Sequence, residues 1–341
     1  MDNCVIPHGY KATALGIIPQ EWEVMLLGNL SNSISSGRNK HRDAHGQYPV
    51  FGSTGIIGYS STYEYEGPVI LVARVGANAG TLNFASGQYD VSDNTLIITI
   101  KQNVYDYNFA YNQLTHYKLN KLVFGSGQPL ITSKQLKNIR IPVPPLAEQR
   151  KIAEVLGVWD KAIEKQARLI EKLALRKRAL MQRLLSAKLR LPGFSEPWKK
   201  VKLGDVAELY QPQTIQSEDL SQTGYPVYGA NGLIGYYNNY NHEYPQVVIT
   251  CRGSSCGTVN FTPGKCWITG NAMVLNVDNN RDVNKSFFYY LISNSSFVNL
   301  ISGSGQPQIV RQPLLKFELR IPPLKEQTAI AEVLTAADRE I

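Results

Sequence analysis

Apolar positions recur in alternating steps of three and four between Leu146 and Leu191. The recurring positions, which include one amide and one lysine, are Ile152, Leu156, Trp159, Ile163, Gln166, Ile170, Leu173, Lys177, Leu180 and Leu184. Such a narrow stripe is typical of a helix that packs along another helix in a coiled coil. The segment has no proline and a single glycine, Gly157. It therefore predicts one long spacer helix, about 65 to 70 Å at roughly 1.5 Å per residue.

The apolar pattern changes to short β-type runs before this helix. Val69 to Val75 and Thr95 to Ile100 are rich in β-branched residues, which predicts buried strands. Tyr48 to Tyr59 mixes β-formers with glycines, so short strands and tight turns are expected there. Asp106 to Lys118 predicts a short helix. A proline-rich stretch at 140–145 then leads stiffly into the long helix.

An internal repeat covers most of the chain. The repeated segments are Tyr48 to Tyr59 with Tyr225 to Tyr236, Arg74 to Phe84 with Arg252 to Phe261, Gly-Ser-Gly-Gln-Pro at 125–129 and 303–307, and Pro145 to Leu156 with Pro323 to Leu334. The shared order of these segments indicates two tandem copies of a unit that consists of a β-rich domain followed by a helix. We therefore expect an α+β fold with two similar β-rich α/β domains.

The repeat also predicts the domain boundaries. We expect a first domain at 1–145, a spacer helix at 146–191, a second domain at 192–320 and a second helix at 321–341. The second helix is shorter than the first, because Ile341 falls at the position of Ile163. Since each domain precedes its own helix, the two helices are expected to pair antiparallel and to hold the domains at opposite ends.

Composition and charge limit the class of protein. A chain of 341 residues with 43% hydrophobic content is long enough for two cores. It has no apolar run of membrane-spanning length and no signal-peptide pattern, so we expect a cytoplasmic protein without a membrane partner. The net charge is +8, and the segment from Leu146 to Leu191 holds twelve Lys or Arg against five Asp or Glu. This excess indicates either a solvated helix face or a surface for a polyanion or an acidic partner.

The sequence contains no convincing catalytic or metal-binding motif. Gly76 to Thr81 lacks the lysine of a phosphate-binding loop, and the Asn-Pro-Pro-aromatic motif of amino-methyltransferases is absent. Cys251, Cys256, Cys266 and His242 could suggest zinc, but the matching positions of the first copy are not cysteines. Buried thiols are therefore favoured over a metal. We expect a non-catalytic chain with no metal and no cofactor of its own.

The two copies differ most in a polar loop that is suited to reading DNA. This loop is basic at Arg38 to His45, whereas its counterpart at 211–219 carries amides and acids. Arg, Lys, His, Asn and Gln are the side chains that read base edges. Two unlike loops on one scaffold indicate recognition of two unlike short sequences, although ordinary loop drift after duplication also explains the difference.

Further polar positions recur beside glycine-rich segments. Gly-Ser-Gly-Gln-Pro could hold a phosphate or a base, or form a structural turn, and Arg74 and Arg252 could contact phosphate or form ion pairs. The DNA-contact candidates are Arg38, Asn39, Lys40, His41, Arg42, Ser53, Arg74, Asn94, Ser126 and Gln128 in the first copy, and Gln213, Gln216, Asn231, Arg252, Asn271, Ser304 and Gln306 in the second.

The repeated segments together resemble the specificity subunit, HsdS, of type I restriction-modification systems. The resemblance depends on both Gly-Ser-Gly-Gln-Pro segments, on 140–149 with 152–156, and on 320–327, and it extends over nearly the whole chain. It implies two target recognition domains that read a split, asymmetric DNA target, with helices that set the gap. The shorter second helix departs from the family pattern, and another copy of the chain could supply the missing stripe.

The same resemblance implies partners. It implies double-stranded DNA, two methyltransferase subunits that dock on the helices, and restriction subunits reached through the complex. S-adenosylmethionine, ATP and Mg are then expected in those subunits. The residues implied at the methyltransferase interface are Leu146, Glu148, Gln149, Arg150, Leu324, Glu326 and Gln327. A stand-alone DNA-binding protein or repressor is the alternative, and a nonspecific scaffold is a weaker one.

Overall fold

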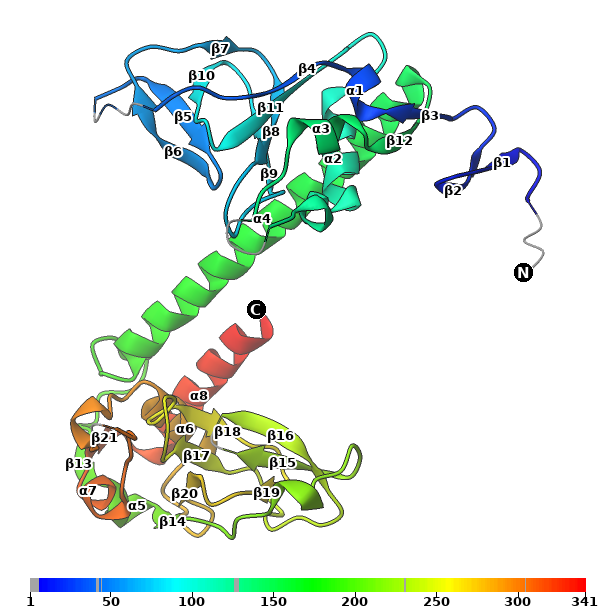
Figure 1. The fold of residues 1–341 in the computed structure, drawn as a ribbon. Helices are drawn as coiled ribbons and strands as arrows, with labels where there is room; N and C mark the ends of the chain where they lie inside the picture. The colour runs from blue at the N-terminus through cyan, green and yellow to red at the C-terminus, as the bar shows by residue number, and fades with distance from the viewer. Residues whose placement is uncertain (1–5, 41–42, 44, 126–128, 230, 304) are drawn as a thin grey trace. The chain divides into compact units, whose positions relative to one another are not determined.

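The computed structural model describes residues 6–40, 43, 45–125, 129–229, 231–303 and 305–341 (Figure 1). The chain divides into two compact units, unit 1 at Met1–Glu164 and unit 2 at Lys165–Ile341. The division falls inside the long helix, so each unit carries part of it. None of the described helices combines the length and the apolar content that a membrane span requires.

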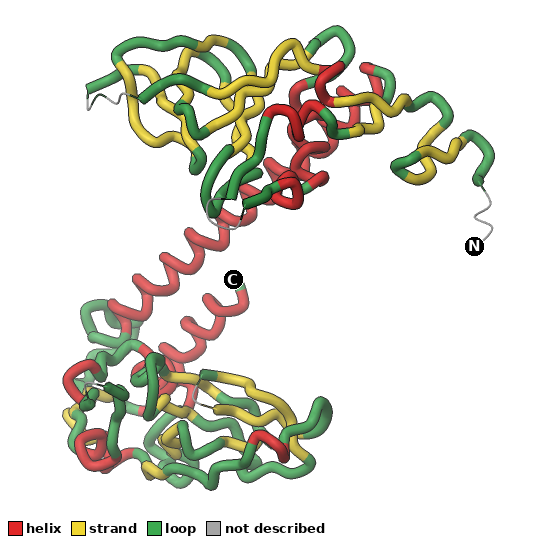
Figure 2. Tube along the Cα trace, in the orientation of Figure 1, coloured by secondary structure: helices red, strands yellow, loops and turns green. Residues whose placement is uncertain are grey.

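Unit 1 consists of two four-stranded sheets beside a group of short helices (Figures 1 and 2). The sheet orders are β4-β11-β8-β9 and β6-β5-β10-β7. The elements are β1 (Tyr10–Thr13), β2 (Gly16–Pro19), β3 (Glu23–Leu26), α1 (Leu27–Leu30), β4 (Ser31–Ser36), β5 (Tyr48–Gly52), β6 (Gly55–Ser60), β7 (Tyr65–Glu66), β8 (Val69–Ala73), β9 (Leu82–Ala85), β10 (Gln88–Val91), β11 (Thr95–Ile100), α2 (Tyr107–Tyr117), η1 (Leu119–Leu122), α3 (Ser133–Lys137), β12 (Arg140–Val143) and the start of α4 (Leu146–Leu184).

Three predicted elements of unit 1 are confirmed. The runs from Val69 and from Thr95 form β8 and β11, which pair antiparallel. The segment from Asp106 to Lys118 forms α2: the Asp106 carboxylate accepts hydrogen bonds from the amides of Asn108 and Phe109, and Lys118 ends the helix with φ of 58°. An Asp cap and a left-handed last residue are usual helix start and stop signals.

The sheet β4-β11-β8-β9, which we call the central sheet of unit 1, is buried on both faces. Ile70 and Ile98 belong to a core with α2 and the other short helices, whereas Leu71 and Ile97 belong to a core with Tyr89 of the second sheet. Strands that are covered on both sides need apolar residues at every position. This explains why β8 and β11 are continuous apolar runs and not alternating ones.

Unit 2 repeats this architecture in the same chain order. Its sheet orders are β14-β20-β17-β18 and β16-β15-β19. The elements are the end of α4, β13 (Lys199–Lys202), α5 (Leu203–Val206), β14 (Glu208–Tyr210), η2 (Ser217–Asp219), β15 (Tyr225–Gly229), β16 (Gly232–Tyr237), β17 (Val247–Thr250), β18 (Val259–Phe261), β19 (Trp267–Ile268), β20 (Ala272–Asn276), α6 (Lys285–Ser293), η3 (Val298–Leu300), α7 (Arg311–Leu315), β21 (Glu318–Ile321) and α8 (Leu324–Arg339). The prediction of two similar β-rich domains, each followed by a helix, is confirmed.

Helix α4 is one unbroken helix of 39 residues, shorter than the predicted run to Leu191. At about 1.5 Å per residue it is about 58 Å long. The chain turns after Leu184 because Ala187 takes a φ of 58° and the Leu189 amide donates back to the Arg183 carbonyl at 3.0 Å. Leu184 and Leu185 are buried in the core of unit 2, so packing against that unit ends the helix before the helical sequence pattern does.

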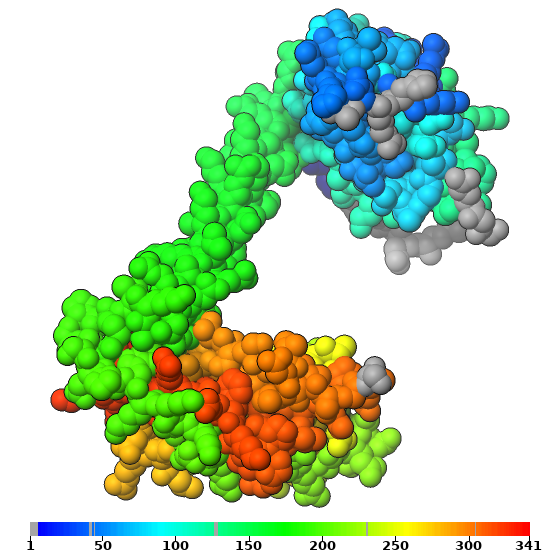
Figure 3. Space-filling model, turned by 90° about the vertical axis from the view of Figure 1, so that its left-hand side faces the viewer, coloured from blue at the N-terminus to red at the C-terminus, as the bar shows by residue number. Residues whose placement is uncertain are grey.

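Within unit 2, α8 runs antiparallel to the end of α4, as predicted. Lys177 pairs with Asp338, and Arg176 Nη1 lies 3.2 Å from Glu340 Oε2. Farther along, Arg190 bonds Glu326. The lysine within the apolar stripe therefore has an acidic partner. The side chains in the middle of α4 are exposed to solvent (Figure 3), and Trp159 is 65% exposed.

A buried histidine in unit 2 predicts a pH-dependent stability. His242 Nδ1 lies 2.6 Å from Asn241 Oδ1 and Nε2 lies 2.9 Å from the Tyr210 hydroxyl. Burial lowers the pKa of His242. The unfolded chain therefore takes up a proton at this residue as the pH falls below about 6.5, while the folded unit does not. We expect unit 2 to lose stability from about pH 6.5 down to the lowered folded pKa, and no further below it.

Thermal unfolding between pH 8 and pH 5 tests this expectation. His242→Gln removes the titrating ring and keeps polar atoms, so the variant should lose less stability on acidification than the wild type. Parallel pH profiles for the two proteins would show that His242 has no part in the pH dependence.

Candidate nucleic-acid interface

The predicted DNA-contact residues of unit 1 gather where the strands of its central sheet end. Leu96 of β11 pairs with Ser36 of β4, and Thr95 pairs with Ala73 of β8. The loops after β4 and β8 and the loop before β11 therefore leave the sheet at one edge. We call the described candidates at this edge the strand-end edge of unit 1. They are Arg38, Asn39, Lys40, Ser53, Arg74 and Asn94.

Hydrogen bonds hold this edge together. The Asn94 carbonyl accepts from the Arg74 amide at 2.9 Å and from the Ser53 hydroxyl at 3.3 Å. Arg74 Nη1 also donates to Ser36 Oγ at 3.3 Å. Asn39, Lys40, Ser53 and Asn94 line a concavity of about 350 Å³, together with Thr54, Asp93 and neighbouring residues. Four candidates from three separate sequence segments thus line one concavity.

The loop after β4 lies against β10 because of a glycine. A Cβ at Gly37 would lie 2.4 Å from the Val91 carbonyl oxygen, so only glycine allows this approach. Asn39 then donates its amide to the buried Asp90 carboxylate. Arg38 Nη1 lies 3.8 Å from Glu64 Oε1 and remains largely exposed. The basic loop is therefore positioned by its backbone and by Asn39, while Arg38 and Lys40 face solvent.

The last residue of each Gly-Ser-Gly-Gln-Pro segment lies beside a predicted arginine. In unit 1 the Gly76 amide donates to the Pro129 carbonyl at 2.9 Å, and in unit 2 the Gly253 amide donates to the Pro307 carbonyl at 3.0 Å. Pro129 and Pro307 are thereby bonded to the residues that follow β8 and β17. The candidates His41, Arg42, Ser126, Gln128 and Ser304 lie outside the described residues.

Unit 2 presents a different set of side chains at the matching edge. Gln213, Asn231, Arg252, Asn271 and Gln306 are all exposed, and we call them the strand-end edge of unit 2. The Asn271 carbonyl accepts from the Cys251 amide at 3.1 Å, which places Asn271 beside the residue before Arg252. The Gln213 carbonyl accepts from Trp267 Nε1 at 3.2 Å.

The remaining described candidate of unit 2 is Gln216. It is exposed just before η2, and its carbonyl accepts from the Asp219 amide at 3.2 Å.

Exposed aliphatic residues lie in the β5–β6 and β15–β16 hairpins, and the sequence analysis did not single them out. Ile56 is 54% exposed in unit 1, whereas both Leu233 (51%) and Ile234 (49%) are exposed in unit 2. The signal for them was present in Gly-Ile-Ile-Gly and Gly-Leu-Ile-Gly, because successive residues of a strand face opposite sides. At least one of the two apolar residues must therefore face outward.

The residues expected at the methyltransferase interface lie at the starts of α4 and α8, and they include both buried and exposed side chains. Gln149 is fully buried: its amide donates to the Val104 and Pro144 carbonyls at 2.9 and 2.8 Å, and its oxygen accepts from the Asp106 amide at 2.8 Å. Gln327 makes the matching bonds to Asp282, Pro322 and Asn284 in unit 2. We call each set of three bonds a glutamine clamp.

The two glutamates at the helix starts also have internal partners. Glu148 accepts from Trp22 Nε1 at 3.1 Å. Glu326 is buried and accepts from Arg190 Nε at 2.6 Å and Nη2 at 2.8 Å. These side chains and both glutamines are therefore occupied by the fold. Leu146, Arg150 and Leu324 remain wholly or partly exposed at the helix starts.

Two of the thiols lie in the core of unit 2. Cys251 and Cys266 are buried free cysteines, and burial raises the pKa of both thiols. Over the described ranges, no group of three or more His, Cys, Asp or Glu side chains is arranged to hold a metal ion.

Comparisons with known proteins agree with the repeated fold. The sequence model of the family "Type I restriction modification DNA specificity domain" matches residues 19–174 and again 195–341. The type I restriction enzyme MjaVIII specificity subunit of Methanocaldococcus jannaschii is 23% identical over 381 residues, which cover 95% of this chain and 88% of that protein.

Solved structures show the same architecture. One is the crystal structure of the S subunit of a type I restriction-modification system from M. genitalium. The superposition covers 94% of this chain and 90% of the M. genitalium chain, with a TM-score of 0.72 and 19% sequence identity. A chain from a structural study of the assembly and conformational transition of the type I system matches with a TM-score of 0.53 and 20% identity. The chain therefore belongs to the type I restriction modification DNA specificity domain family, as a non-catalytic DNA specificity subunit of a type I restriction-modification complex.

Proposed function

We propose that each unit reads one block of a split DNA target through its strand-end edge. The observation that carries the proposal is that two units with the same fold present unlike polar side chains at the same edge. Unit 1 offers Arg38, Asn39 and Lys40 in the loop where unit 2 offers Gln213. Because different bases display different donor and acceptor patterns in the major groove, unlike edges select unlike sequences.

Different side chains of each strand-end edge suit different parts of the DNA: phosphate groups, base edges and thymine methyl groups. Lys40 is suited to phosphate, which positions a protein on the duplex without specifying sequence. Asn94, Asn271 and Gln306 can pair with base edges through their amides. The exposed Ile56 and Leu233 suit the thymine methyl group, since apolar contacts read that group in the major groove.

The helices set the spacing and receive the catalytic partners in this proposal. Helix α4 runs without a break from unit 1 into unit 2, and in this proposal its length sets the gap between the two blocks of the target. The exposed residues at the helix starts and the exposed middle of α4 are surfaces for two methyltransferase subunits, with restriction subunits joining through them. S-adenosylmethionine, ATP and Mg belong to those partners.

Exchange of the basic loop tests the assignment of one block to one unit. Replacing residues 38–45 by their unit 2 counterpart removes the side chains that distinguish the edge of unit 1. We expect binding to DNA with an altered first block to change, because base contacts there are worth about 1 to 3 kcal/mol each. Discrimination within the second block should be unchanged.

Competition binding with duplexes that are altered in one block at a time measures both effects. The matched control replaces the exposed residues 101–103 by alanines, because they follow β11 at the end of that strand opposite to the strand-end edge. A loss of discrimination in both blocks after the 38–45 exchange would contradict the proposal.

Insertion of one helical turn into the exposed middle of α4 tests its role in spacing. Four residues added after Lys165 lengthen the helix by about 6 Å and rotate it only slightly beyond one turn. We expect the gap between the two blocks to lengthen while both blocks remain the same. Mapping of methylated sites by the assembled complex measures the gap, and an altered block with an unchanged gap would contradict a spacing role for α4.

A further inference from the structure

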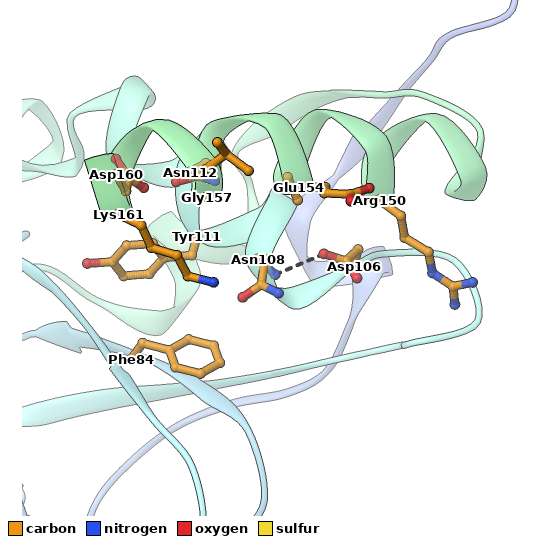
Figure 4. Close-up of a pocket in the computed structure, with 12 residues that line it drawn as sticks. Phe84, Asp106, Asn108, Tyr111, Asn112, Arg150, Glu154, Gly157, Asp160 and Lys161 are labelled. Atoms are coloured by element: carbon orange, nitrogen blue, oxygen red, sulfur yellow. Dashed lines mark hydrogen bonds between the residues drawn. The ribbon is translucent and has the colours of Figure 1, made fainter. Parts of the chain in front are cut away.

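Unit 1 contains a groove between α2, the start of α4 and the end of β9 (Figure 4). Its volume is about 690 Å³. Phe84 and Tyr111 form an aromatic wall, with ring centroids 6.2 Å apart and planes at 83°. Lys161 extends from α4 toward these rings, and Gly157 leaves the α4 side open (Figure 4). The groove therefore combines aromatic, basic and acidic surfaces within one unit.

In unit 2 a tyrosine side chain, Tyr290, occupies the position that corresponds to this groove. The wall in unit 2 is Phe261 against Tyr289, with centroids 5.2 Å apart. Tyr290 of α6 reaches α8, where its hydroxyl donates to Asp338 Oδ2 at 2.5 Å and lies 3.2 Å from Thr335 Oγ1. The Lys177 ammonium lies 5.8 Å from the centre of the Tyr290 ring. A tyrosine with an acid at its hydroxyl and a cation above its ring thus closes the groove of unit 2.

The repeat relates the two grooves residue by residue. The helix caps Asp106 and Asn284 and the clamps Gln149 and Gln327 fix the same register for both helices. In this register the positions of Tyr290, Thr335 and Asp338 are held in unit 1 by Asn112, Gly157 and Asp160. Unit 1 therefore keeps the aromatic wall and the acid, but it lacks the tyrosine ring and the threonine beside it.

The charges of the groove disfavour nucleic acid as its ligand. Asp106, Glu154 and Asp160 line it against Arg150 and Lys161. A phosphate backbone would be repelled by this acidic excess. A neutral side chain that donates a hydrogen bond to Asp160 suits the site, because a buried phenol requires a polar partner for its hydroxyl.

We propose that the groove of unit 1 binds a tyrosine side chain presented by a methyltransferase subunit, as Tyr290 fills the groove of unit 2. The hydroxyl donates to Asp160, the ring packs on Phe84 and Tyr111, and the Lys161 ammonium lies over the ring face. This deepens the docking role in the proposed function and rests on it. It also distinguishes the two ends of the subunit, because Tyr290 occupies the matching place in unit 2.

The double substitution Asn112→Tyr with Gly157→Thr tests the proposal by building the unit 2 arrangement into unit 1. A Cβ at Gly157 would meet nothing within 4 Å, and threonine and tyrosine replace a flexible glycine and an asparagine. The variant should therefore melt at or above the wild-type temperature. We expect it to bind the methyltransferase subunit of its own system at least about tenfold more weakly at one of two sites, since the groove is filled.

Matched variants separate filling of the groove from other effects. His116→Ala changes an exposed residue of α2 that does not line the groove, and this variant should bind the methyltransferase as the wild type does. Asp160→Ala removes the acceptor and should weaken the same site about tenfold, as expected for loss of a hydrogen bond to a charged group. Calorimetric titration of the full chain with the methyltransferase measures all four proteins.

The outcomes separate this proposal from the function on which it rests. Full-strength binding of both methyltransferases to the double variant, or to Asp160→Ala, overturns the tyrosine site and leaves docking intact. Absence of any binding to the wild-type chain overturns docking and the tyrosine site together. DNA binding by the isolated chain tests the strand-end edges independently of either result.

Discussion

Replacement of Gln327 by alanine is expected to lower the stability of unit 2 by about 3 kcal/mol. It removes the partner of one buried and two part-buried backbone groups, and an unsatisfied buried group costs about 1 to 3 kcal/mol before relaxation. Gln327 is 1% exposed, and its clamp joins the start of α8 to Asp282 and Asn284, which precede α6. Loss of the clamp therefore loosens the joint between helix and domain as well as removing the bonds.

Hydrogen exchange of unit 2 amides measures this loss without requiring the whole chain to unfold in one step. Amides near Asn284 and along α8 should exchange faster, while those of unit 1 should be unchanged. Gln149→Ala is the mirror experiment and should affect unit 1 alone. Lys325→Ala, an exposed neighbour, is the control. Exchange rates at the wild-type level in Gln327→Ala would show that the clamp contributes little.

Replacement of Arg252 by alanine is expected to weaken binding to the DNA target by about 10- to 100-fold, the range for loss of one specific arginine contact. Arg252 is exposed and follows β17, where the Gly253 amide bonds to the Pro307 carbonyl. The guanidinium thus starts from a fixed backbone beside Asn271 and Gln306. Such anchoring lowers the entropy that a long side chain loses on binding.

Two further observations distinguish the roles open to Arg252. If the guanidinium pairs with a base, Arg252→Lys should bind nearly as weakly as Arg252→Ala, because lysine lacks the planar fork. If it contacts phosphate, Arg252→Lys should restore most of the affinity, and the alanine variant should lose about one unit of salt dependence. Wild-type affinity in Arg252→Ala would remove this residue from the interface. Fluorescence anisotropy over a salt series provides both measurements.

The sequence predicted the long-range organisation because the chain is duplicated. A repeat of β-rich domain plus helix needs no knowledge of packing to be recognised, and β8, β11 and α2 have strong local patterns. The end of α4 was placed too late. The residues from Leu185 to Leu191 are good helix formers, and the turn at Ala187 depends on contacts with the core of unit 2.

The site was harder to predict because side-chain roles depend on tertiary contacts. Gln149, Gln327 and Glu326 look like exposed polar residues of a helix start in the sequence. Their burial follows from carbonyls, amides and an arginine that approach from elsewhere in the chain. By contrast, Asn94 and Arg74 were proposed separately and lie together, because antiparallel strands bring their ends to one edge.

Selection of DNA sequences from a random duplex library by the assembled complex tests the central claim most directly. The account predicts two short conserved blocks at a fixed distance, with Asn94→Ala relaxing one block and Asn271→Ala relaxing only the other. A single continuous block, or relaxation of both blocks by either variant, would contradict it.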